Sequence, residues 1–244
     1  MVQGAGFQLN IVILTGAGIS AESGLGTFRD TDGLWSRYNI EDVATPTAFA
    51  RNPVLVHEFY NLRRQAMRAA APNAAHFGLA EQERNHKGNF CLVTQNVDDL
   101  HHRAGSKHVL AMHGALQMAR CADCNHIWHA PDLMAATDKC QVCGGGRCRP
   151  DVVWFDEQVR FLDEIVAVTK AADLFVMIGT SANVHPAASL MALARKSGAV
   201  TVEFNLEPSS AAGSADHVIL GPATLTVPEW LSKGDFQVRR TKSE

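Results

Sequence analysis

Two Cys-x-x-Cys pairs are the feature that most constrains this chain. Cys121 and Cys124 form the first pair, Cys140 and Cys143 form the second, and residues 125–139 separate them. This spacing is typical of a ribbon in which four thiolates surround one Zn²⁺ ion. Four sulfur ligands leave no position for water, so the pattern predicts a structural zinc. A disulfide or free thiols are the alternative, and Cys148 follows closely enough to compete as a ligand.

The composition is that of an ordinary globular protein and gives no sign of a strongly charged binding surface. The 244 residues carry a net charge of −3, and 46% of them are hydrophobic. The absence of a basic excess argues against nucleic acid as a partner. No apolar run approaches the ~20 residues that span a bilayer, and residues 1–9 lack the segments of a signal peptide. We therefore expect a cytoplasmic protein that does not enter the membrane.

Four apolar runs predict the strands of a parallel sheet. They cover residues 9–14, 90–94, 174–178 and 200–204, and the first of them is β-branched and apolar without alternation, which suits a strand buried on both faces. Each run leads into a polar or glycine-rich turn. Because ligands of open α/β sheets lie outside the carboxyl ends of the strands, we expect these four turns to line one crevice.

The segments between the strands predict helices. Asn52-Pro53 and Asn73 are helix-start signals, and Pro186 opens a helix that ends near Gly198. The expected fold is α/β, with a Rossmann-like parallel sheet and helices on both of its faces. A small lobe interrupts it. We expect a helical insertion at 36–72 and a zinc ribbon at 117–149 in this lobe, and the Rossmann-like domain at 1–35, 73–116 and 150–244.

A glycine-rich turn follows the first strand. Gly16-x-Gly18-x-x-Ala21 fits the fingerprint in which glycines let the backbone approach a pyrophosphate. A tight turn without a ligand is the alternative. A dehydrogenase would continue into a long helix, but Ser23-Gly24-Leu25-Gly26 interrupts the helix at once, and residues 27–35 resemble a flap with an aromatic side chain and a cation. Such a flap can close over a cofactor and exclude water.

The run GAGISAESGLGTFRDTDGLW, which begins at Gly16, resembles the cofactor loop of the sirtuins, the Sir2-type NAD⁺-dependent protein lysine deacylases. The resemblance continues in the family's order through TQNVDDLHHRAGS, MHG, the cysteine pairs, RPDVVWF, GTSANVHPA and NLEPS, and covers nearly the whole chain. It implies NAD⁺ as co-substrate, one structural Zn²⁺, and acyl-lysine proteins or peptides as substrates. Within the family, the chain resembles the bacterial class III group and the desuccinylase–demalonylase group.

The resemblance makes His113 of the MHG motif the general base. In this family the acyl oxygen of the modified lysine attacks C1′ of the nicotinamide ribose, nicotinamide departs, and a base activates a ribose hydroxyl. The products are nicotinamide and 2′-O-acyl-ADP-ribose. A histidine suits this role because its pKa lies near the working pH. A structural histidine is the alternative for any one of the eleven in the chain.

The resemblance also implies the cofactor contacts. Asn96 and Asp98 would bind the ribose and the nicotinamide carboxamide, with turn stabilisation as the alternative, while Phe28 would screen C1′ and Arg29 would hold the flap. Adenine would lie on Ala223, for which plain loop packing is the alternative. The complete expected set is Gly16, Ala17, Gly18, Ser20, Ala21, Thr27, Phe28, Arg29, Trp35, Gln95, Asn96, Asp98, Gly179, Thr180, Ser181, Asn205, Leu206, Glu207 and Ala223.

Two residues indicate the acyl group. Tyr60 and Arg63 are three positions apart and would share a helix face. By resemblance they form a pair that binds a carboxylate on the acyl group, and a guanidinium with a phenol suits a succinyl or malonyl end. A solvated basic helix with one inward aromatic is the alternative structure, and plain deacetylation is the alternative activity. The expected peptide-binding residues are Val153, Trp154 and Phe155.

The chain departs from the family pattern at two positions. Asp151 and Asp156 stand where the family often has His and Gly. We expect catalysis to survive both changes, and Asp156 to alter the peptide preference and to disfavour acidic flanks.

Three other functions compete with the deacylase assignment. The early end of the first helix argues against an NAD-dependent oxidoreductase. The balanced charges of the ribbon argue against a zinc-ribbon nucleic-acid module. ADP-ribosyl transfer shares the cofactor chemistry up to the loss of nicotinamide and stays open.

Overall fold

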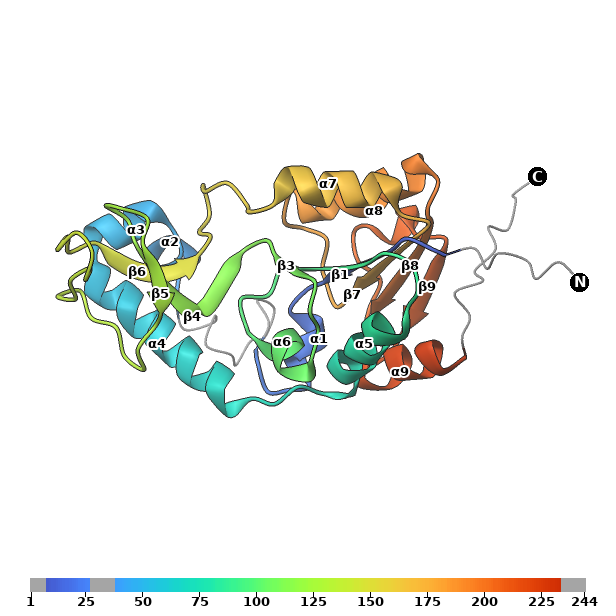
Figure 1. Cartoon of the computed structure of the whole chain (residues 1–244), viewed down its shortest axis with the longest axis horizontal. Coiled ribbons are helices and arrows are strands. Elements are labelled where there is room, and N and C mark those ends of the chain that lie inside the picture. Colours follow the sequence, from blue (N-terminus) through green and yellow to red (C-terminus); the bar gives the residue numbers. More distant parts are fainter. Residues whose placement is uncertain (1–7, 27–37, 234–244) are drawn as a thin grey trace, which may run out of the picture.

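The computed structural model describes residues 8–26 and 38–233. Its centre is a six-stranded sheet in the order β3-β2-β1-β7-β8-β9, and Figure 1 shows it beside a smaller lobe. Every pair of neighbouring strands in this sheet is parallel. The order is that of the doubly wound nucleotide-binding fold, in which the chain changes direction between the first and fourth strands. The predicted Rossmann-like class is confirmed.

The predicted strands agree with the observed ones except at the edges of the sheet. The strand predicted at residues 9–14 is observed at Ile11–Thr15, and Leu9 and Asn10 lie before its first residue. Both edge strands escaped prediction: one has three residues, and the other alternates in exposure because only one side of it is covered. The strands are β1 (Ile11–Thr15), β2 (Phe90–Thr94), β3 (Val109–Ala111), β7 (Leu174–Ile178), β8 (Val200–Asn205) and β9 (His217–Leu220).

Helices cover both faces of the sheet, as predicted. In Figure 1, α7 and α8 lie over one face, and α5 and α9 lie over the other. The side chains of Val12 and Leu14 pack in the cluster of α7 and α8, whereas Ile11 and Ile13 pack in that of α5 and α9. Successive residues of a strand point to opposite faces, so a strand covered on both sides favours apolar residues at every position. This explains the uninterrupted apolar run that predicted it.

The helix-start signals are also confirmed. The side chain of Asn52 accepts a hydrogen bond from Leu55 N, and that of Asn73 accepts one from Ala75 N. The helix after Pro186 ends at Gly198, which has a φ of 110°. The helices are α1 (Gly18–Ala21), α2 (Ile40–Val43), α3 (Pro46–Arg51), α4 (Pro53–Ala69), α5 (Ala74–Asn85), α6 (Leu100–Ala104), α7 (Leu162–Ala171), α8 (Ala187–Ser197) and α9 (Ala223–Ser232).

The small lobe consists of helices α2 to α4 and a three-stranded antiparallel sheet. The strands are β4 (Gly114–Cys121), β5 (Ile127–His129) and β6 (Cys148–Val152), in the order β5-β4-β6. One apolar cluster joins the two parts, with Phe59 of α4 packed near Leu116 and Trp154. The lobe therefore shares a core across its helical and ribbon segments. Among the helices at 8–26 and 38–233, none combines the length and apolar content that a membrane crossing requires.

Candidate functional site

One cavity of about 850 Å³ lies at the carboxyl ends of β1, β2, β7 and β8, and the small lobe forms its other wall. The turns after all four predicted strands line it, which confirms the expectation that they share one crevice. Thr27, Phe28, Arg29 and Trp35 lie outside the described residues. The other expected residues that line the cavity are Gly16, Ala17, Gly18, Ser20, Ala21, Tyr60, Arg63, Gln95, Asn96, Asp98, His113, Val153, Trp154, Phe155, Gly179, Thr180, Ser181, Asn205, Leu206, Glu207 and Ala223.

The glycines of the first turn are required by packing. A Cβ added to Gly16 would lie 2.7 Å from Gly179 O, and one added to Gly18 would lie 2.7 Å from Gly179 Cα. The turns after β1 and β7 touch through their backbones, and Gly18 N donates a hydrogen bond to Gly179 O at 2.8 Å. Helix α1 ends four residues after it begins, so the predicted early break is confirmed. The two turns leave bare backbone at the point where a dinucleotide fold accepts phosphates.

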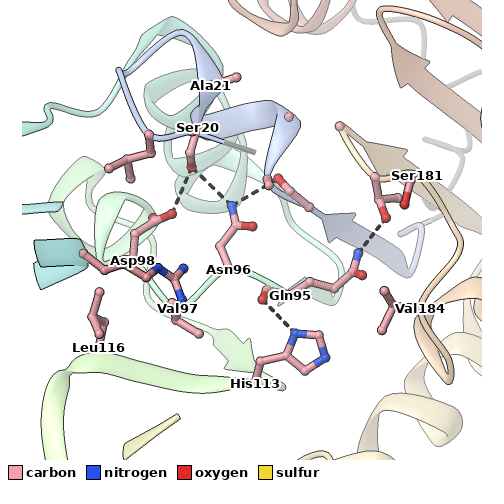
Figure 2. Close-up of a pocket in the computed structure, with 18 of the residues that line it drawn as sticks. Ser20, Ala21, Gln95, Asn96, Val97, Asp98, His113, Leu116, Ser181 and Val184 are labelled. Atoms are coloured by element: carbon pink, nitrogen blue, oxygen red, sulfur yellow. Dashed lines mark hydrogen bonds between the residues drawn. The ribbon is translucent and has the colours of Figure 1, made fainter. Parts of the chain in front are cut away.

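A polar network lies between the turns after β1 and β2 (Figure 2). The amide of Asn96 donates to Gly16 O at 3.1 Å and to Ser20 Oγ at 3.2 Å. Ser20 Oγ in turn donates to Asp98 Oδ2 at 3.1 Å, and Asp98 Oδ1 accepts from Leu100 N. Burial raises the pKa of Asp98, while its two hydrogen bonds oppose the rise. These groups offer a carboxylate acceptor and an oriented amide, which fits the ribose and carboxamide of a nicotinamide dinucleotide.

His76 extends this network, although the sequence analysis did not single it out. His76 is fully buried on α5, its Nδ1 accepts from Asn73 N at 3.3 Å, and its Nε2 lies 3.4 Å from Ser20 Oγ. His76 Nδ1 also lies 3.0 Å from Asn73 Oδ1, so this ring joins the cap of α5 to the network around Ser20. Burial lowers the pKa of His76 to about 4. No local motif signals this contact, because His76 stands inside an ordinary helical pattern.

His113 is held with its base nitrogen available. Its Nδ1 lies 2.8 Å from Gln95 O, so Nδ1 carries the hydrogen and Nε2 carries the lone pair. Burial lowers the pKa of His113 below its ordinary value of 6.5, against the opposing effect of the Gln95 carbonyl. The next residue, Gly114, has a φ of 82°, and a Cβ there would lie 2.2 Å from Asp151 O. At neutral pH the ring is an uncharged base on the wall of the cavity.

The opposite end of the cavity is formed by α4 and the segment after β6. Tyr60 is 2% exposed, and its hydroxyl oxygen accepts a hydrogen bond from Trp154 Nε1 at 2.9 Å. The Cζ atom of Arg63 lies 5.7 Å from the centre of the Tyr60 ring. Burial lowers the pKa of Arg63, while Tyr60 and Asp98 oppose the change. Arg64 is buried elsewhere and donates to Leu116 O. Tyr60 and Arg63 therefore line the cavity together, unlike the side chains of a solvated helix.

The apolar wall of the cavity is the part that the sequence analysis missed. Ala44, Val97 and Leu116 line it between the Tyr60 end and the polar network, and Figure 2 shows Val97 and Leu116 near Asp98. Phe155 N donates to Ala44 O at 3.0 Å, which fixes the segment after β6 against the helical part of the lobe. Ala44 and Leu116 carry no motif, and Val97, although it stands inside the TQNVDD motif, cannot be distinguished from a core residue in a sequence.

The four cysteines of the ribbon converge. The sulfurs of Cys121 and Cys143 are 3.6 Å apart, those of Cys124 and Cys140 are 3.7 Å apart, and all four lie within 4.8 Å of one another. A tetrahedral zinc with bonds of about 2.3 Å requires sulfurs about 3.8 Å apart, so the four residues fit one Zn²⁺. Cys148 lies opposite Cys121 in the β4–β6 ladder but outside this group.

The two departures from the family pattern have distinct structural settings. Asp151 is 2% exposed and forms a two-pronged ion pair with Arg160. Asp156 is exposed at the edge of the cavity and has a φ of 69°. Glycine favours this left-handed conformation, and Asp is among the few other residues that tolerate it. Asp151 thus forms an ion pair in a buried place, and Asp156 occupies a backbone conformation that glycine favours.

Comparison with known proteins identifies the family of this chain. The profile of the Sir2 family matches residues 16–186. This chain belongs to the Sir2 family. A Caulobacter vibrioides sirtuin named NAD-dependent protein deacylase is 49% identical over 229 residues, which cover 92% of this chain and 96% of the relative. A protein of the same name from Bdellovibrio bacteriovorus is 51% identical over 227 residues, with the same coverage.

Solved sirtuin structures also resemble this chain. The crystal structure of a Sir2 homolog–NAD complex aligns with a TM-score of 0.85 and 42% identity, and covers 91% of this chain and 88% of that one. The resemblance seen in the sequence motifs is therefore confirmed for the family and for the fold.

Proposed function

We propose that this chain is an NAD⁺-dependent protein lysine deacylase that prefers succinyl and malonyl groups and also removes acetyl groups. One observation carries the proposal: a single cavity contains His113, with Nε2 available as a base, and the Tyr60–Arg63 pair. The relatives named NAD-dependent protein deacylase support the reaction class. The products are the free lysine, nicotinamide and 2′-O-acyl-ADP-ribose.

The residues around His113 would bind and orient the reactants. NAD⁺ supplies the departing nicotinamide and the ribose that receives the acyl group. Asp98 accepts a hydrogen bond from the carboxamide, and Asn96 is held beside the ribose by its bonds to Gly16 and Ser20. His113 Nε2 takes the proton of a ribose hydroxyl. The turns at 179–181 and 205–207 bind the phosphates and the adenosine ribose.

Zn²⁺ would have a structural role. The four thiolates complete its coordination, and the ribbon that they close contacts α4 through hydrogen bonds from Asn61 and Arg64 to Met134. The zinc therefore supports the wall of the cavity that Tyr60 and Trp154 form. Cysteines arranged for a metal also support a cytoplasmic location, where thiols stay reduced.

The Tyr60–Arg63 pair supports the preference for an acidic acyl group. Arg63 is half-buried on the wall of the cavity, where desolvation lowers its pKa, and such a cation gains from a carboxylate partner. An acetyl group offers no charge to this end of the cavity. A succinyl or malonyl group places its carboxylate between the guanidinium and the phenol. The acyl-lysine peptide would lie along Val153 to Phe155 as an added strand.

Mass spectrometry tests the reaction and the preference together. NAD⁺ is incubated with acetyl-, malonyl- and succinyl-lysine forms of one peptide, and the expected products are nicotinamide and the matching acyl-ADP-ribose. ADP-ribosylated peptide would instead indicate ADP-ribosyl transfer. Reduced nicotinamide, seen by its absorbance, would indicate an oxidoreductase.

Substitution of the arginine tests the acyl pocket. Arg63→Met is expected to lower kcat/KM for the succinyl peptide by about 10²-fold and to leave the acetyl peptide as the better substrate. Arg68→Met is the matched control, because Arg68 lies on the same helix with an exposed side chain. Intact desuccinylation by Arg63→Met would contradict the proposed preference and support a plain deacetylase.

A further inference from the structure

We propose that Trp154 is a positioning residue for acyl selectivity, because its indole N–H holds the Tyr60 hydroxyl with its hydrogen directed at the end of the acyl group. This inference rests on the proposed function, since it adds a residue to the same acyl pocket. It predicts that one hydrogen bond between buried side chains contributes to the choice between acidic and neutral acyl groups.

The first step concerns how Trp154 itself is held. The guanidinium of Arg149 stacks on its ring, with Cζ 3.3 Å from the ring centre. The same guanidinium donates to both carboxylate oxygens of Glu157 at 2.6 and 2.9 Å and to Val152 O at 2.7 Å. Glu157 also accepts from Trp154 N at 2.8 Å. The indole therefore has its ring face and its backbone both constrained, and its N–H points in one direction.

The second step concerns the Tyr60 oxygen. An indole N–H only donates, so the Tyr60 oxygen must accept the 2.9 Å hydrogen bond from Trp154. The guanidinium of Arg63, with Cζ 5.7 Å from the centre of the Tyr60 ring, also has only donors. Neither neighbour can accept the hydroxyl hydrogen. The hydroxyl hydrogen is left to donate, and within residues 8–26 and 38–233 the structure shows no acceptor for it.

The third step concerns what this hydrogen can meet. Tyr60 is 2% exposed, and its ring packs edge-on against Phe59 with the centres 5.0 Å apart, so the phenol cannot turn away. A carboxylate that enters beside Arg63 receives a charge-assisted hydrogen bond from the hydroxyl. An acetyl group leaves the hydroxyl without an acceptor in a buried place, which penalises that substrate. Trp154 thus acts on selectivity through Tyr60.

The test removes the indole N–H, and one of its two variants keeps the bicyclic ring. Trp154→Phe, and the same position carrying benzothienylalanine, which keeps the bicyclic ring but lacks the N–H, are assayed with succinyl- and acetyl-lysine forms of one peptide. The ratio of kcat/KM for succinyl over acetyl is expected to fall about tenfold, mainly through KM of the succinyl peptide. Trp128→Phe makes the same change in β5, outside the cavity, and should leave the ratio unchanged.

A double variant separates a positioning role from a general one. Tyr60→Phe removes the hydroxyl that Trp154 acts on, so Trp154→Phe should lower the ratio no further when the two are combined. A full additional loss in the double variant would overturn the inference, as would an unchanged ratio with benzothienylalanine. If Tyr60→Phe and Arg63→Met also leave the ratio unchanged, the proposed acyl preference fails. If those two lower it and the Trp154 variants do not, only this inference fails.

Discussion

The Nδ1 atom of His113 lies 2.8 Å from the carbonyl oxygen of Gln95. This contact assigns the hydrogen to Nδ1 and leaves Nε2 as a base, because a carbonyl oxygen can only accept. Gln95 belongs to the turn after β2, and its own amide donates to Thr180 Oγ1 in the turn after β7 at 2.9 Å. The orientation of the candidate base therefore depends on two turns of the Rossmann-like sheet.

The pH dependence of deacylation should follow this histidine. Burial lowers the pKa of His113 below 6.5, so the ring is neutral at pH 7 and becomes protonated only in more acidic solution. We expect kcat/KM to be flat near neutral pH and to decline with an acid limb whose midpoint lies below 6.5. His113→Gln should lower the rate by roughly 10²–10⁴-fold. A pH–rate profile checks both, and a midpoint above 6.5 would contradict the structural assignment.

Removal of zinc should unfold the ribbon and abolish activity. The four sulfurs lie in a ribbon whose own apolar cluster is small, and this ribbon contacts α4 through Met134. We expect one zinc per chain by metal analysis, and its loss in Cys140→Ser together with a lower melting temperature. Cys91→Ser and Cys148→Ser are controls that should retain the metal. Zinc loss in Cys148→Ser would instead make that residue a ligand.

Acid should destabilise the fold through buried histidines. The pKa of His76 falls from 6.5 to about 4 on folding because of burial, so the unfolded chain binds the proton more readily. The contribution to stability is complete above pH 6.5 and is lost as the pH falls toward 4, with a loss of about 2 kcal/mol at pH 5. Urea unfolding at pH 7.5 and pH 5 measures this difference.

The matched variants for this measurement are His76→Gln and His102→Gln. His102 is exposed beside the buried His101, so its replacement should preserve the difference between the two pH values. His76→Gln should reduce it, because one fewer buried histidine titrates. Equal pH dependence in His76→Gln and the unsubstituted protein would refute this origin of the acid sensitivity.

Asp156 should bias the peptide preference. Its carboxylate is exposed at the edge of the cavity, and its φ of 69° suits Asn or Gly as well. Asp156→Asn removes the charge and keeps the backbone, so kcat/KM should rise about threefold for a peptide with Glu beside the acyl-lysine and fall for one with Lys there. Added salt should weaken both effects. The result that disproves this is an unchanged ratio between the Glu and Lys peptides at low salt.

Much of the fold could be predicted because its central strands are buried on both faces. Burial on two sides favours apolar residues at successive positions, and this produces the runs that identify β1, β2 and β7, whereas β8 alternates with the fully buried Thr201 and Glu203. The edge strands give a weaker signal, because β3 has only three residues and β9 alternates in exposure. The two cysteine pairs predicted the metal group for a similar reason, since the coordination geometry of zinc restricts the spacing of its ligands.

The sequence by itself determined the family, the class of the sheet, the four sulfur ligands and the residue types around the cavity. Only the tertiary structure decided how they are oriented. The bond from Trp154 to Tyr60 spans 94 residues, and that between Ser20 and Asp98 spans 78. Local periodicity reports which face of a strand or helix is buried. It carries no information about which distant group a side chain meets there, so the available nitrogen of His113, the hydrogen bond from Trp154 to Tyr60 and the buried contact of His76 follow from packing alone.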